Sequence, residues 1–152
     1  MVKSGALEKA EGSGPNLKGV INLQQAAQDG PPTRWIAGDS VDIADGGRLV
    51  VDIGETSVGI FRVEGKLYAY LNVCMHMGGP ACQGKILPRV LDVLDDQKRA
   101  LGQTWDESDP HVVCPWHGFE YSIKTGQHAG RPSIALKAVP VQEAEGRVYV
   151  TI

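Results

Sequence analysis

The chain has 152 residues, 42% of them hydrophobic and 22% charged, which is typical of a single soluble globular domain. Its formal net charge of −3 leaves no basic footprint, so nucleic acid and anionic membrane surfaces are excluded as partners. The N-terminal segment lacks the apolar core of a signal peptide, and no apolar run approaches the ~20 residues of a membrane helix. We therefore expect a cytoplasmic protein.

The first 32 residues are rich in glycine, alanine, serine and glutamine. We interpret 1–32 as a flexible N-terminal arm, in which a disordered tail and a short amphipathic helix over 17–27 both stay open. The remaining residues, 33–152, are predicted to form one domain.

Short strand patterns separated by turn residues run through this domain. Before the first cysteine, strands are predicted at 35–37, 48–53, 57–63 and 66–71. After residue 114, strands are predicted at 121–123, 135–141 and 147–151. Together with nineteen glycines and nine prolines, this pattern favours an all-β sandwich or barrel.

Two short segments each pair a cysteine with a histidine. The sequence C-M-H occupies 74–76 and C-P-W-H occupies 114–117, and glycines follow both segments closely. A C-x-H pair and a distant C-x-x-H pair have the spacing of a Rieske centre, where two cysteines bind one iron and two histidines the other. Glycines at such loops let backbone N–H groups approach inorganic sulfides.

We predict that Cys74, His76, Cys114 and His117 bind one [2Fe–2S] cluster. Two neutral imidazoles in place of two thiolates make the site less negative, so its potential lies above the about −400 mV of plant-type clusters. A structural zinc site with the same four ligands is the alternative. Zinc fingers usually pair like ligands, whereas each pair here is mixed, and this favours iron–sulfur.

These motifs, with Gln83-Gly84 and Thr125-Gly126, make residues 35–152 similar to the Rieske ferredoxins of aromatic-ring-hydroxylating dioxygenase systems. The resemblance implies an antiparallel β-sandwich base with a small two-loop subdomain that binds the cluster. It also implies surface-exposed histidine ligands and an electron-transfer role between a flavin reductase and a terminal oxygenase.

Differences between this sequence and two other classes of Rieske protein exclude those classes. Respiratory Rieske proteins carry a disulfide whose two positions correspond to Gly79 and Trp116 here, so the respiratory class is excluded. A terminal oxygenase needs a mononuclear iron with two histidines and a carboxylate, but only His111 and His128 remain. We expect no catalytic site. The alternatives are a permanently bound small Rieske subunit of a larger oxidoreductase and, third, a zinc-binding module without redox activity.

The interval between the two cysteine–histidine pairs is longer than in the similar ferredoxins, and the excess falls at 88–110. Its pattern of strand, polar turn and strand predicts an extra hairpin, either a partner-selecting surface or a tolerated excursion.

Several residues near the motifs have less distinctive patterns. Cys82 is interpreted as a buried free thiol rather than a ligand. Met77, Trp116 and Phe119 are candidates for an apolar docking rim, although core packing is favoured for the two aromatic residues.

Overall fold

The computed structural model describes residues 31–152, so the predicted flexible N-terminal segment, 1–32, lies outside the described residues except for its last two positions. The helix considered over 17–27 also lies outside them. Within the described residues, two 3-10 helices occur, η1 (Ser40–Asp42) and η2 (Ala81–Gln83), and no helix is long and apolar enough to span a membrane. The strands in chain order are β1 (Arg34–Asp39), β2 (Arg48–Ile53), β3 (Thr56–Val63), β4 (Lys66–Leu71), β5 (Lys85–Leu94), β6 (Ala100–Val113), β7 (Glu120–Ser122), β8 (Gln127–His128), β9 (Arg131–Ala135), β10 (Val141–Ala144) and β11 (Arg147–Thr151).

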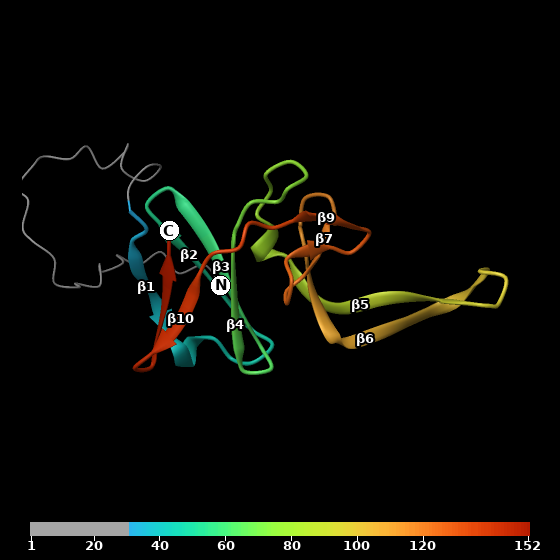
Figure 1. The fold of residues 1–152 in the computed structure, drawn as a ribbon, viewed down its shortest axis with the longest axis horizontal. Helices are drawn as coiled ribbons and strands as arrows, with labels where there is room; N and C mark the ends of the chain where they lie inside the picture. Colours follow the sequence, from blue (N-terminus) through green and yellow to red (C-terminus); the bar gives the residue numbers. More distant parts are fainter. Residues whose placement is uncertain (1–30) are drawn as a thin grey trace, which may run out of the picture.

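The strands form three antiparallel sheets, with orders β1-β11-β10, β2-β3-β4 and β5-β6-β7-β8-β9. Figure 1 shows the β2–β4 sheet between the other two. The predicted all-β fold, a sandwich base with an additional subdomain, is confirmed.

The middle sheet is buried on both faces because successive side chains of a strand point to opposite sides. In β3, Val58 and Ile60 enter the core shared with β1, β10 and β11. Phe61 and Val63 enter a second core, shared with β6, β7 and the residues that follow β4. One sheet therefore supports two hydrophobic cores.

Gly59 gives the second core room for a cysteine. A Cβ added at Gly59 would lie 2.2 Å from Cβ of Cys82 and 2.5 Å from its Sγ. Only glycine lets β3 and η2 approach so closely.

The strand predicted over 135–141 is wrong. β9 ends at Ala135 and β10 begins at Val141, and the connection between them runs beside β4. It makes one isolated bridge there, between Tyr70 and Ala138, flanked by the hydrogen bond from N–H of Val139 to the carbonyl of Ala69, 2.8 Å. Pro140, which has no N–H, follows directly and limits continued pairing.

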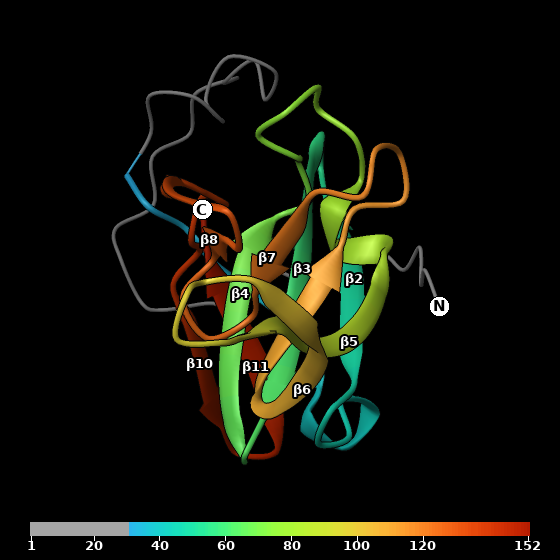
Figure 2. The ribbon, with the colours of Figure 1, turned by 90° about the vertical axis from the view of Figure 1, so that its right-hand side faces the viewer.

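The long interval between the two motifs forms the β5–β6 hairpin, which extends sideways from the body in Figure 1 and points toward the viewer in Figure 2. Its base, from Lys85↔Val113 to Pro88↔Pro110, belongs to the five-stranded sheet. The register then shifts, since Arg89 pairs with Asp106 and leaves 107–109 as an insertion in β6. Beyond this irregularity the two strands continue as a projecting ribbon.

Gly59→Ala is expected to destabilise the fold by roughly 1–3 kcal/mol, because overpacking forces β3 and η2 apart. Urea unfolding measures the change. The control is Gly130→Ala, whose added Cβ meets no heavy atom closer than 3.6 Å and should alter stability by less than about 0.5 kcal/mol. Equal effects of the two substitutions would contradict the packing argument.

Candidate metal centre

The first cysteine–histidine segment forms a tight loop directly after β4. N–H of Cys74 donates to the carbonyl of Gly79, 2.7 Å, and N–H of Gly78 donates to the carbonyl of Cys74, 2.8 Å. Gly78 has a φ of 76°, a left-handed conformation that favours glycine. The loop thus closes on itself and turns His76 outward.

The second segment repeats this turn between β6 and β7. N–H of Cys114 donates to the carbonyl of Phe119, 2.8 Å, and N–H of Gly118 donates to the carbonyl of Cys114, 3.0 Å. Gly118 has a φ of 72°. Both loops therefore start with cysteine and have left-handed glycine at the fifth position, while histidine is third in one and fourth in the other.

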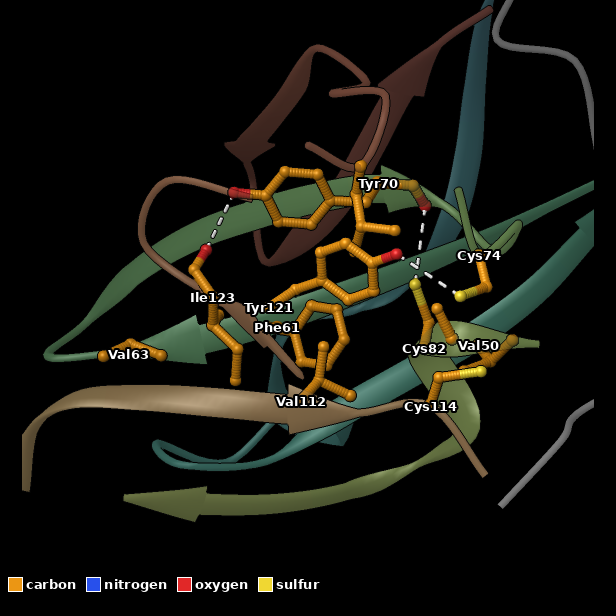
Figure 3. Packing of buried hydrophobic residues seen from close by; sticks show 12 residues of the cluster. Val50, Phe61, Val63, Tyr70, Cys74, Cys82, Val112, Cys114, Tyr121 and Ile123 are labelled. Atoms are coloured by element: carbon orange, nitrogen blue, oxygen red, sulfur yellow. Dashed lines mark hydrogen bonds between the residues drawn. The ribbon is translucent and has the colours of Figure 1, made fainter. Parts of the chain in front are cut away.

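The structure brings all four predicted residues to one place. Cys74 and Cys114 are buried, whereas His76 and His117 are exposed and their ring centroids lie 4.9 Å apart at an interplanar angle of 89°. Figure 3 shows the two thiols at one end of the second core. The donors thus form an inner sulfur pair and an outer imidazole pair.

This donor arrangement suits two metal ions better than one. Among the described residues, no group of three or more His, Cys, Asp or Glu side chains closes around a single metal ion. A tetrahedral zinc site needs four ligands around one point. A [2Fe–2S] cluster instead takes a sulfur pair on one iron and an imidazole pair on the other, which is the division seen here.

Tyr121 links the buried sulfur pair to the core. Its Oη lies 3.3 Å from Sγ of Cys74 (Figure 3) and accepts a hydrogen bond from N–H of Met75, 3.2 Å. Burial raises the pKa of the Cys74 thiol, but hydrogen bonds from Tyr121 and the backbone outweigh it, so this pKa lies below its usual value. Burial and the neighbouring Cys74 raise the pKa of Cys114. A cation bound to both sulfurs would offset the repulsion between the two thiolates.

Aromatic side chains fix the imidazole edge. Phe119 stacks on His76, with centroids 4.3 Å apart and planes 7° from parallel. Trp116 was expected in the core, but it is 58% exposed and packs against Gly79, where an added Cβ would lie 2.7 Å from the indole. Met77, a candidate for the apolar docking rim, is 63% exposed.

Cys82, the third cysteine, is fully buried and takes no part in either loop. Its N–H donates to Oδ1 of Asn72, 2.9 Å, and Arg48 fixes the end of η2 through the carbonyl of Gln83, 3.0 Å. The interpretation as a buried free thiol is confirmed.

A buried hydrogen-bond network around His111 lies at the base of the hairpin, and the sequence did not predict its partners. His111 is 1% exposed, with Nδ1 2.8 Å from Oε1 of Glu120 and Nε2 2.9 Å from Oδ2 of Asp109. Asp109 also accepts from Ser122, 2.6 Å, and pairs with Arg89, 3.6 Å. The sequence allows either a solvated or a hydrogen-bonding His111, because its partner Glu120, nine residues away, is brought close only by the pairing of β6 with β7.

Comparison with known proteins gives a consistent pattern. The family profile described as Rieske [2Fe-2S] domain matches residues 34–141. The ferredoxin component of the alkene monooxygenase system of Xanthobacter autotrophicus is 24% identical over 109 residues, covering 72% of this chain and 73% of that protein.

Similar solved structures share the fold. One, described as an NADH-dependent nitrite reductase small subunit from Mycobacterium tuberculosis, has a TM-score of 0.59 and 17% identity, covering 80% of this chain and 96% of that one. The ferredoxin of carbazole 1,9a-dioxygenase from Nocardioides aromaticivorans has a TM-score of 0.52 and 19% identity, covering 78% and 95%.

Replacing Cys82 by alanine should flatten the alkaline dependence of stability. Burial raises the pKa of the Cys82 thiol from 9.0 to about 12, so the native state keeps a proton that the unfolded chain releases. The stabilisation is complete below pH 9 and is lost as pH rises toward 12, at roughly 1.4 kcal/mol per pH unit for one group. Urea midpoints of both proteins below and above pH 9 measure this loss, and parallel curves would contradict it.

Proposed function

Because the chain belongs to the Rieske [2Fe–2S] domain family, whose cofactor is a Rieske-type [2Fe–2S] cluster, we propose that it is an electron-transfer protein. It passes single electrons from a reductase, of the flavin-dependent kind, to a terminal oxygenase. It has no catalytic site of its own and works in the cytoplasm, where a free thiol such as Cys82 persists in the reduced state. With this cofactor, the zinc-binding alternative is not retained.

We assign Cys74 and Cys114 to one iron and His76 and His117 to the other. The observation that carries this proposal is the division of donors. Both thiols are buried, and both imidazoles are exposed with their ring centroids 4.9 Å apart. When bound, the cluster supplies a one-electron redox couple above that of four-cysteine clusters.

The chain's own residues set the conditions for electron exchange. The buried cysteines and Tyr121 exclude water from the inner side, which belongs to the second core. The exposed imidazoles of His76 and His117 give a partner protein the shortest approach, and Phe119 holds the His76 ring in place. The apolar rim around them suits a transient contact.

The second candidate is a small Rieske subunit that stays bound to a larger oxidoreductase. The projecting β5–β6 hairpin and the likeness to a structure described as a nitrite reductase small subunit favour it. Native mass separates the two, since a carrier purifies alone and a subunit purifies in a stoichiometric complex.

Anaerobic purification tests the proposal. The protein should be red-brown, contain iron and acid-labile sulfide in equal amounts, and give an electron paramagnetic resonance signal with an average g below that of four-cysteine clusters. A colourless protein that contains zinc would refute it.

His117→Ala should lose most of the cluster, because one iron would keep a single protein ligand. Iron, sulfide and the resonance signal measure the loss. His128→Ala is the control, since His128 lies 4.7 Å from the Phe119 ring by centroid yet belongs to neither loop. A His117 variant with full cluster content would contradict the assignment.

Tyr121→Phe should keep the cluster and lower its reduction potential by a few tens of millivolts, on the order of 1 kcal/mol. The hydroxyl donated to Cys74 stabilises the more negative, reduced state, and phenylalanine removes it. Protein-film voltammetry measures the potential. Tyr70→Phe is the matched control, because the Tyr70 hydroxyl donates to the carbonyl of Ile123, 2.8 Å, within the same core. Equal shifts in both variants would count against the sulfur contact.

A further inference from the structure

The projecting part of the β5–β6 hairpin, residues 89–109, is here called the arm. Its strands carry large apolar side chains in solvent, notably Leu101, 69% exposed, and Trp105, 59% exposed, with Val93 and Leu94 also exposed. Figure 1 shows the arm leaving the body with no described strand beside it. An exposed apolar patch of this kind marks an interaction site.

The strand register places Trp105 on a defined face of the arm. Trp105 pairs with Val90 across the ribbon, and Gln103 pairs with Asp92. Nε2 of Gln103 donates to Oδ1 of Asp92, 3.3 Å, which places that pair on one face. Because alternate residues of a strand share a face, Trp105 lies on the same side as this polar pair, next to its cross-strand partner Val90. Leu101 lies closer to the tip, at the register shift between Val93 and Leu94.

The arm is built to keep its shape. At its tip, Oδ1 of Asp95 accepts hydrogen bonds from the backbone N–H groups of Gln97, 2.9 Å, and Arg99, 2.8 Å. Oδ2 of Asp95 accepts from Nε of Arg99, 2.6 Å. A bare two-stranded ribbon is marginally stable in water, so an ordered tip on an uncovered ribbon fits a preformed binding element.

The charge of the arm identifies what it binds. Residues 89–109 contain six acidic and three basic residues, so the arm carries a net charge of −3, equal to that of the whole chain, and the remainder is neutral. Two ion pairs, Arg99–Asp95 and Arg89–Asp109, use two of its three cations. A second copy would bring like charges together, and nucleic acid or an anionic membrane would be repelled. A basic protein surface is favoured.

We propose that the arm is a docking element for a partner protein that presents an apolar surface bordered by lysine and arginine. The inference rests on the proposed electron-transfer function and names its partner's surface. β5 begins one residue after η2 and β6 ends directly before Cys114, so the arm continues the two strands that also lead to the metal centre.

Oxidised cytochrome c, a basic one-electron haem protein, serves as the probe. It is titrated into the cluster-loaded full chain at low ionic strength, and affinity is measured by calorimetry. Trp105→Ser should weaken binding about tenfold and Leu101→Ser should weaken it similarly. The pair Asp92→Asn with Glu107→Gln should weaken it about fivefold and flatten its salt dependence.

Matched controls lie on the body. Val41→Ser replaces an 89% exposed valine of η1, and the pair Asp52→Asn with Glu55→Gln removes the same charge from β2 and the turn after it. Both should leave affinity within about twofold. If the body and arm variants weaken binding equally, net charge alone acts and the inference is overturned.

Two further measurements separate the outcomes. Sedimentation that reveals a dimer abolished by Trp105→Ser would assign the arm to a second copy and overturn the inference. Stopped-flow mixing of the dithionite-reduced protein with cytochrome c tests the proposed function separately. Binding without haem reduction contradicts electron transfer, whereas haem reduction with unchanged affinity in the arm variants overturns the docking role alone.

Discussion

The burial of the β2–β4 sheet on both faces is the constraint on which the rest of this structure depends. Val58 and Ile60 of β3 join the base core, and Phe61 and Val63, one and three residues after Ile60, join the core beneath the metal centre. Because one strand serves both, the subdomain cannot move as a unit without exposing apolar side chains of the base. The glycine at 59 belongs to this constraint, since it lets η2 settle against β3.

The inner side of the metal centre is part of the second hydrophobic core. Cys74, Cys114 and Tyr121 are all members of the second core. The same closed turn occurs twice, so two loops that differ in sequence present their cysteines inward at equivalent positions. The histidines, offset by one residue between the loops, emerge on the solvent side. Burial of the sulfurs and exposure of the imidazoles thus follow from one repeated backbone geometry.

Local pattern predicted much of this fold, and tertiary contact decided the rest. The strands over 48–53 and 66–71 follow alternation and turn residues, which are visible in the sequence. The four proposed ligands were predicted from the spacing of the two motifs and the glycines that follow them. The segment 135–141 also has strand-forming residues, but it bonds to β4 through only a short stretch, a fact set by the distant Tyr70.

Trp116 and Tyr121 also show the difference between what local sequence predicts and what tertiary contacts decide. Sequence favours burial for Trp116 because indoles are usually core residues, yet the indole is 58% exposed and covers Gly79 of the other loop. Tyr121 suits packing and hydrogen bonding equally, and in the structure it does both. Which contact a side chain makes across two loops is not encoded in either loop alone.

The separation of charge from the metal centre gives the molecule two independent surfaces. The imidazole edge is small and rimmed by apolar side chains such as Met77, while the net charge resides in residues 89–109. Charges steer association over about 8 Å at physiological salt, but an electron moves efficiently only at close contact. Substitutions in the arm can therefore change which partner is captured without touching the residues that set the potential. The long interval between the two motifs is where such a difference between otherwise similar ferredoxins is most easily accommodated.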